Sequence, residues 1–130
     1  MKEYHAGDPS DHEFDIFVFG SNLAGIHGRG AALHAYTYYD AEWGIGEGKQ
    51  GSSYALPTKD QNLKVLSLEE ISKNIQKFLM MAESNPHKTF FVTRIGCGLA
   101  GYKDSQIAPM FKHAPTNCIL PYEWKEYHGK

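Results

Sequence analysis

Cysteine is scarce in the 130-residue sequence, which contains only Cys97 and Cys118. Neither stands in a CxxC pair or at a Cys/His spacing that suits zinc, and the seven histidines form no HxH or HExxH pattern. The sequence therefore gives no support for a disulfide framework or a metal site. We expect two reduced thiols, no metal ion and no required cofactor.

Long hydrophobic runs and an excess of charge of one sign are also missing. No segment approaches membrane-spanning length, and residues 1–15 lack the apolar stretch of a signal peptide. The formal net charge is −2, and the basic residues are scattered rather than gathered into the stripe that a nucleic-acid surface needs. We therefore expect a cytoplasmic protein that partners no membrane, and we disfavour nucleic acid as a partner.

Four short apolar runs are typical of strands buried on both faces, as in parallel sheets. They cover residues 15–19, 52–56, 89–93 and 117–120. Pro57 should end the second run, because proline cannot donate to a central ladder.

Helical patterns alternate with these runs. Residues 31–36 favour helix, and a capping-box pattern at Ser67 begins a helix that apolar spacing extends to residue 83. Asp104 or Ser105 can begin a short helix that ends at Phe111. This alternation predicts an α/β protein with a mostly parallel central sheet flanked by helices. We expect one domain over residues 1–130, with residues 1–14 as a polar leader.

Two glycine-rich loops follow predicted strands. The first runs from Gly20 to Gly30 and leads into a helix, and the second runs from Gly96 to Gly101. Ligands of open parallel sheets bind beyond the carboxyl ends of the strands, where glycine loops offer free N–H groups and a helix start offers its positive end. The loops match neither GxxxxGK[ST] nor GxGxxG, and their glycines also suit tight turns or close packing. Together they predict an anion site between them.

The residues of both loops resemble a known family. Residues 19–35, FGSNLAGIHGRGAALHA, resemble the macrodomain pattern in which an Asn ends a strand and a glycine-rich loop leads into an Ala-rich helix. Residues 93–102, TRIGCGLAGY, are similar to the second phosphate-binding loop of macrodomains. The branch that includes the terminal ADP-ribose protein glycohydrolases also has an IGCGL segment and an upstream Thr-Lys pair, here Thr58 and Lys59. Small phage and bacterial proteins that read FVFGSNLAGxHGxGAA, YALPTKD and RIGCGLAGY share the three motifs in this order.

The resemblance implies a three-layer macrodomain-like fold and ADP-ribose, or a related nucleotide, as the ligand. The sequence departs from the family in two places. Macrodomains carry an acidic residue that holds the adenine amine before the strand that corresponds to residues 15–19, whereas here that region reads as a short polar leader. The glycohydrolase branch has an Asp after IGCGL that works with the Lys, whereas this chain has Ala100.

The expected ligand-binding residues fall into two sets. The first loop contributes Gly20, Ser21, Asn22, Leu23, Ala24, Gly25, His27, Gly28, Arg29, Gly30 and Ala31. The second contributes Thr93, Ile95, Gly96, Cys97, Gly98, Leu99, Ala100, Gly101 and Tyr102.

Four residues are candidates for catalysis. Asn22 and His27 could place a water molecule or move a proton, and Lys59 or Asp104 could assist. Each also has a structural interpretation, since Asn stabilises turns, Asp caps helices, and His or Lys suits an exposed surface.

Three hypotheses follow from these residues. The leading one is binding of ADP-ribose or a related nucleotide, with the diphosphate between the two loops. The second is hydrolysis of an ADP-ribosyl bond, on an ADP-ribosylated macromolecule, or of a phosphate of ADP-ribose. The third is a factor that sequesters a nucleotide or binds another protein without catalysis. Because many macrodomains only bind, the resemblance alone does not imply turnover.

Overall fold

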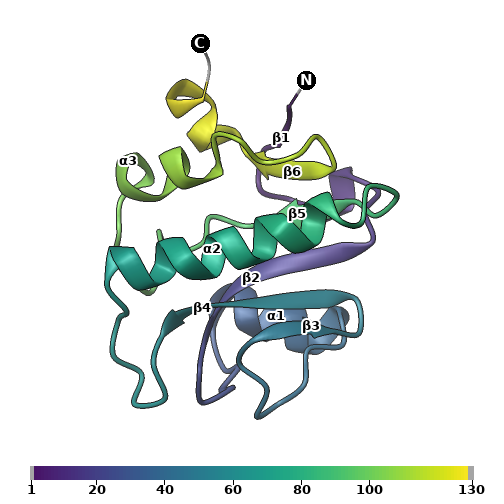
Figure 1. Cartoon of the computed structure of the whole chain (residues 1–130). Coiled ribbons are helices and arrows are strands. Elements are labelled where there is room, and N and C mark those ends of the chain that lie inside the picture. The colour runs from purple at the N-terminus through teal and green to yellow at the C-terminus, as the bar shows by residue number, and fades with distance from the viewer. Residues whose placement is uncertain (1, 129–130) are drawn as a thin grey trace.

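A six-stranded sheet runs through the molecule in the order β1-β6-β5-β2-β4-β3 (Figure 1). Its strands are β1 (Glu3–His5), β2 (Ile16–Asn22), β3 (Gly48–Gln50), β4 (Ser53–Lys59), β5 (Phe90–Val92) and β6 (Cys118–Pro121). All neighbouring strands are parallel except the β3–β4 pair. The computed structural model describes residues 2–128, and it confirms the predicted α/β class with a mostly parallel sheet.

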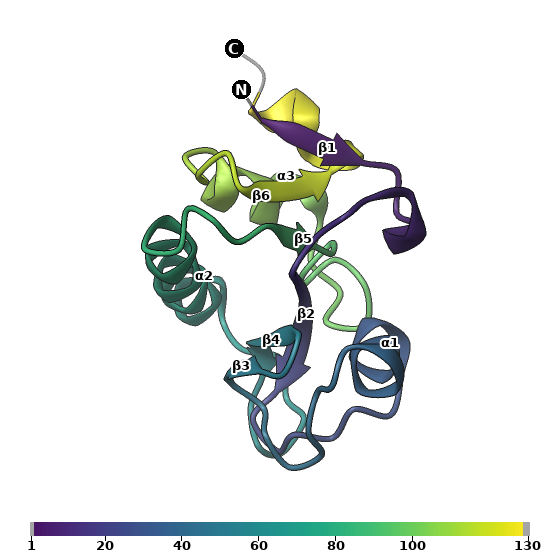
Figure 2. The same cartoon turned by 90° about the vertical axis from the view of Figure 1, so that its right-hand side faces the viewer.

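Helices cover both faces of this sheet. Figure 2 shows α1 (Gly30–Tyr38) on one face and α2 (Leu68–Glu83) on the other. The short helix α3 (Asp104–Ile107) continues as a 3₁₀ turn, and a second such turn follows β6. None of the helices within residues 2–128 is long and apolar enough to cross a bilayer.

The pleat of β2 divides the core in two, because successive side chains of a strand point to opposite faces. Ile16 and Val18 pack with Ile71, Ile75 and other residues on the α2 side. Phe17 and Phe19 belong to a smaller cluster with Ala32 and Ala35 of α1. Small alanines let α1 approach the sheet closely, which brings its first turn to the carboxyl end of β2.

The region expected as a polar leader contributes an edge strand instead. Residues 3–5 pair in parallel with β6, and a 3₁₀ turn follows at Pro9–Asp11. His5 fixes this segment, because its Nε2 lies 2.6 Å from the carbonyl oxygen of Val92 and its ring stacks on Phe91. Three residues are too few to show a strand period in the sequence.

The two strands that carry the site run further than expected. β4 continues through Pro57 to Lys59, so the expectation that Pro57 ends it is wrong. β3 pairs only with residues 53–55, so no outer strand requires the N–H that Pro57 lacks. Similarly, β2 extends to Asn22, which places Gly20, Ser21 and Asn22 in the strand rather than in the loop.

Candidate functional site

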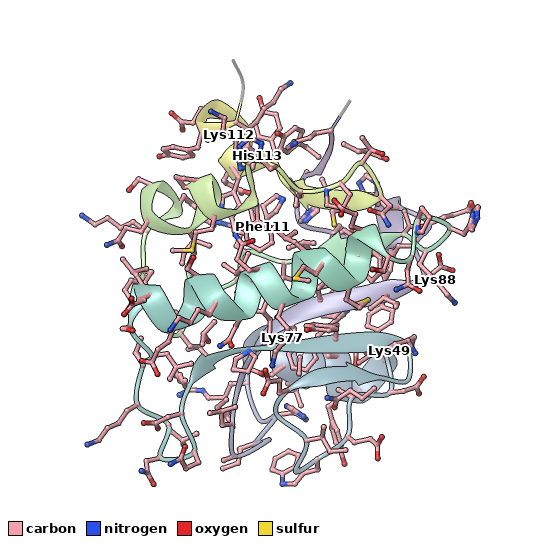
Figure 3. All side chains as sticks on the ribbon, in the orientation of Figure 1. Lys49, Lys77, Lys88, Phe111, Lys112 and His113 are labelled. Atoms are coloured by element: carbon pink, nitrogen blue, oxygen red, sulfur yellow. The ribbon has the colours of Figure 1, made fainter. Side chains whose placement is uncertain are left out.

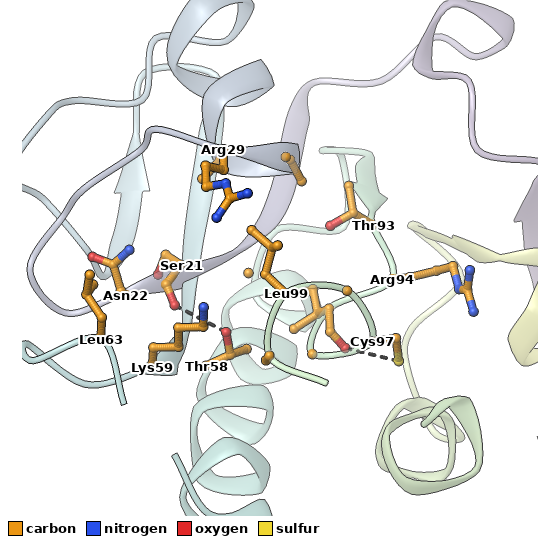
Figure 4. A pocket seen from close by; sticks show the side chains of 18 of the residues that line it. Ser21, Asn22, Arg29, Thr58, Lys59, Leu63, Thr93, Arg94, Cys97 and Leu99 are labelled. Atoms are coloured by element: carbon orange, nitrogen blue, oxygen red, sulfur yellow. Dashed lines mark hydrogen bonds between the residues drawn. The ribbon is translucent and has the colours of Figure 1, made fainter. Parts of the chain in front are cut away.

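A hollow of about 450 Å³, here called the main hollow, opens at the carboxyl ends of β2, β4 and β5 (Figure 4). This is the edge where open parallel sheets bind ligands. Both predicted glycine loops face it. Its lining residues are Gly20, Ser21, Asn22, Ile26, Gly28, Arg29, Gly30, Ala31, Ala32, Thr58, Lys59, Leu63, Thr93, Arg94, Ile95, Gly96, Cys97, Gly98, Leu99 and Ala100.

The first loop presents free backbone amides to the main hollow. α1 begins at Gly30, and the first amides of a helix have no partner within the helix. Within residues 2–128, no acceptor bonds the amides of Gly28, Gly30 and Ala31. Gly30 has φ +57°, a conformation that favours glycine, and this turns the chain into the helix. The helix start thus offers N–H groups and the positive end of the helix dipole.

The second loop presents a similar set. Its turn closes through the amide of Tyr102, which donates to the carbonyl of Gly96 at 2.8 Å. The amides of Gly98, Leu99 and Ala100 have no acceptor in the part of the chain described. Nothing lies within 4 Å of the position that a Cβ on Gly98 would take, so a ligand can approach this backbone closely.

The charges that line the main hollow are all positive. They belong to Arg29, Lys59 and Arg94, and no carboxylate of residues 2–128 lines it. Arg94 is paired with Asp104, with Nη2 2.6 Å from Oδ2, and Figure 4 shows its guanidinium directed away from the hollow. Arg29 and Lys59 form no ion pair with another described residue. The hollow therefore favours an anion.

Asn22 lines the main hollow, but its amide is engaged within the loop. Its Oδ1 accepts from the amide of Ile26 and its Nδ2 donates to the carbonyl of Ile26, both at 2.9 Å. Asn22 therefore braces the turn that follows β2, as its structural interpretation suggested.

His27 and Asp104 do not line the main hollow. His27 is fully buried under the first loop, with Nε2 2.8 Å from the carbonyl oxygen of Glu42. Asp104 accepts hydrogen bonds from Arg94 and from Nε1 of Trp124. Of the four candidate catalytic residues, the structure brings only Asn22 and Lys59 together.

Cys97 lines the main hollow with a protonated thiol. Burial and the nearby Asp104 carboxylate raise the pKa of this thiol to about 12. Since the thiolate is the nucleophilic form, the site does not activate Cys97.

Five other expected binding residues do not line the main hollow. They are Leu23, Ala24, Gly25, Gly101 and Tyr102. The hydroxyl of Tyr102 donates to the carbonyl of Leu66 at 2.6 Å, which anchors the second loop to the start of α2. The hydroxyl of Tyr102 is therefore engaged with the protein.

Sequence reasoning did not select several lining residues, namely Ile26, Ala32, Thr58, Leu63 and Arg94. Thr58 could have been selected from the sequence, because it belongs to the Thr-Lys pair near the end of a strand. Its hydroxyl donates to the carbonyl of Ser21 at 3.2 Å and ties β4 to β2. No sequence pattern pointed to Leu63, since it reaches the main hollow from an irregular turn.

A second, smaller hollow of about 350 Å³, here called the side hollow, adjoins the first. The two share Gly30, Ala31 and Thr93. Phe17 and Phe91 line the side hollow together with His34, and Gly7 and Pro9 of the N-terminal segment also line it. The side hollow is thus aromatic where the main hollow is rich in amides and positive charge.

Comparison with solved structures identifies proteins of the same architecture. The macrodomain of Thermus aquaticus DarG matches with a TM-score of 0.67 and 14% identity, over 94% of this chain and 97% of that one. The macrodomain of Mycobacterium tuberculosis DarG matches with a TM-score of 0.62 and 16% identity, over 93% and 97%. Thermosipho africanus DarTG, solved in complex with ADP-ribose, matches with a TM-score of 0.61 and 18% identity. That match covers 85% of this chain and 39% of DarTG.

No protein-family model and no curated protein sequence matches the chain. The matches to the two DarG macrodomains span 94% and 93% of the chain, with TM-scores of 0.67 and 0.62. The protein therefore has a macrodomain-like fold.

Proposed function

We propose that the protein binds ADP-ribose, with the diphosphate held between the two glycine loops. One observation carries the proposal: free amides from both loops line a hollow that has Arg29 and Lys59 on its walls and no carboxylate from the described part of the chain. Two facing sets of amides suit two linked phosphates, because each phosphate needs several donors. The ADP-ribose in the DarTG complex, a protein of similar fold, supports this choice of ligand.

We propose that the nucleobase lies in the side hollow, beside the diphosphate. Phe17 and Phe91 supply an apolar wall for a planar base, and the hollow meets the diphosphate site at Gly30 and Thr93. The second ribose then extends toward Asn22 and Lys59, which Figure 4 shows at the far end of the main hollow. An extended nucleotide with a base at one end and a sugar at the other fits this order of environments.

Hydrolysis has less support than binding. His27 and Asp104 lie outside the hollow and are bonded to protein groups, and Cys97 is protonated. Lys59 is the remaining candidate that could assist a reaction at the second ribose. Sequestration of the nucleotide stays compatible with the same site.

Calorimetry with ADP-ribose tests the proposal. Arg29→Ala and Lys59→Ala should each weaken binding by roughly tenfold, because each removes a charged donor from a phosphate or ribose. Lys88→Ala is the matched control, since Lys88 lies in the turn between α2 and β5, away from the hollow (Figure 3). This control should bind as the wild type does. Absence of heat from folded wild type at millimolar ADP-ribose would overturn the proposal.

A further inference from the structure

His27 is a fully buried polar residue that the ligand site does not use. Its Nε2 lies 2.8 Å from the carbonyl oxygen of Glu42 and 3.1 Å from that of Ile45. Both partners are acceptors, so Nε2 carries a hydrogen and donates it to them. Nδ1 is buried and has no partner among the residues described. The ring lies edge-on to Phe19 and to Trp43.

The segment that His27 bonds, residues 42–46, is here called the lower loop. A second buried side chain, Gln50, also bonds it. Gln50 accepts from the amide of Glu42 at 2.6 Å and donates to the carbonyl of Ile45 at 3.2 Å. His27 and Gln50 thus share the Ile45 carbonyl, and no residue of the lower loop lines the main hollow.

Glycines let the lower loop and the first glycine loop pack backbone against backbone. The amide of Gly44 donates to the carbonyl of Gly25 at 2.8 Å. A Cβ on Gly25 would overlap the backbone of Gly44, and a Cβ on Gly46 would overlap the carbonyl of Asn22. The hydroxyl of Ser21 also donates to the carbonyl of Gly46. Gly25 therefore serves this contact rather than the ligand.

We propose that the lower loop is a template that sets the shape of the first glycine loop before the ligand binds, with His27 as the positioning residue that joins the two. This inference rests on the proposed function. A glycine-rich loop without such support would have to be ordered by the ligand, and that ordering costs binding free energy. Because His27 and Asn22 hold the chain just before Gly28, the amides of Gly28 to Ala31 are aimed into the main hollow in advance.

A pair of glycine substitutions separates this role from general strain. Gly46→Ala should force the two loops apart and weaken ADP-ribose binding by roughly tenfold or more. Gly48→Ala is the control, because Gly48 has φ +96° and open space at its Cβ position. Gly48→Ala strains the backbone two residues after Gly46 without touching the first glycine loop. This variant should unfold more easily than the wild type, but it should bind ADP-ribose within about threefold of the wild-type affinity.

Substitutions of His27 test the hydrogen bonds themselves. Gln places an amide nitrogen at the same number of bonds from Cβ as Nε2 of His, so His27→Gln should keep ADP-ribose affinity within about threefold of the wild type. His27→Phe leaves the Glu42 and Ile45 carbonyls without this donor, and it should weaken binding by roughly tenfold. Equal affinity of His27→Phe and the wild type would overturn the proposal, as would equal weakening in both variants.

Hydrogen exchange on the wild type provides a readout that needs no variant. Saturating ADP-ribose should slow exchange in residues 42–46 as well as in residues 28–31, and leave residues 84–88 unchanged. Slowing confined to residues 28–31 would overturn the template role while leaving the proposed function intact. Absence of calorimetric heat with wild type would instead overturn the proposed function.

Discussion

Asp8 stands between two residues that line the side hollow, Gly7 and Pro9. Its Oδ1 accepts hydrogen bonds from the amide and the hydroxyl of Ser10, and these bonds lower the pKa of the carboxyl. Oδ2 has no partner among residues 2–128. An ionised carboxylate accepts hydrogen bonds and cannot donate, so Asp8 is suited to an amino group at the edge of a base. The N-terminal region therefore brings one acidic residue, Asp8, next to the side hollow.

Substitution of Asp8 should change base selectivity more than phosphate binding. Asp8→Ala should weaken ADP-ribose binding by roughly threefold to tenfold, since a hydrogen bond to a charged acceptor is lost. The hypoxanthine analogue presents a carbonyl in place of the amine, so its affinity should be lower in the wild type and change little in the variant. Calorimetry with both ligands measures this. A parallel loss for both would assign Asp8 to the fold of the turn instead.

The start of α2 connects the helix layer to the second glycine loop. Ser67 and Glu70 form a capping box, and the neighbouring Leu66 carbonyl accepts from Tyr102 of the second loop. Further along, Asn74 donates to the carbonyl of Pro57 at 3.1 Å and ties the helix to β4. The apolar face of α2 supplies most of the contact with the sheet. The capping box therefore adds to the free energy of unfolding, but it is not required for the fold.

Ser67→Ala should lower the free energy of unfolding by about 1 kcal/mol, because the amide of Glu70 loses its acceptor. Urea unfolding measures the change. Ser72→Ala within the same helix is the control, and it should leave stability the same or slightly higher, since alanine is the better helix former. If Ser67→Ala unfolds at the wild-type urea concentration, the cap contributes nothing in this context.

At the scale of the whole molecule, two histidines near the chain ends, His5 and His128, bond the backbone of distant segments. His5 bonds the Val92 carbonyl, and His128 bonds the Ala108 carbonyl and lies 3.0 Å from the hydroxyl of Tyr4. Burial lowers the pKa of both imidazoles below their ordinary value of 6.5. Hydrogen bonds lower the pKa of Asp104 and Asp15 as well.

These shifts predict a loss of stability in acid. Below pH 6.5 the unfolded chain binds protons that the folded His5 and His128 resist, so the free energy of unfolding falls as the pH drops. It should fall again below about pH 4, where Asp15 and Asp104 of the unfolded chain take up protons. Urea unfolding between pH 8 and pH 3 measures the profile, and His5→Gln should flatten its slope between pH 7 and 5. Stability that rises from pH 7 to 5 would contradict the prediction.

Most elements could be predicted from local patterns, since the apolar runs and the capping box at Ser67 follow from residue type and spacing. β1 and the extension of β4 through Pro57 could not. β1 depends on β6, which is distant in sequence. The extension of β4 depends on where β3 begins, because pairing that starts at Gly48 leaves Pro57 without a partner in β3.

The same division holds for the candidate site. The sequence by itself determined that two glycine loops follow buried strands, and the parallel order of those strands places both at one edge. Only the tertiary structure decided which residues face the hollow. It buried His27, turned Asp104 toward Arg94 and Trp124, and brought Leu63 and the N-terminal turn to the rim. Side-chain direction in a loop depends on what packs behind it, and for His27 that is the lower loop. The glycines of residues 43–51 indicate a loop in the sequence, but they do not show that it packs against His27.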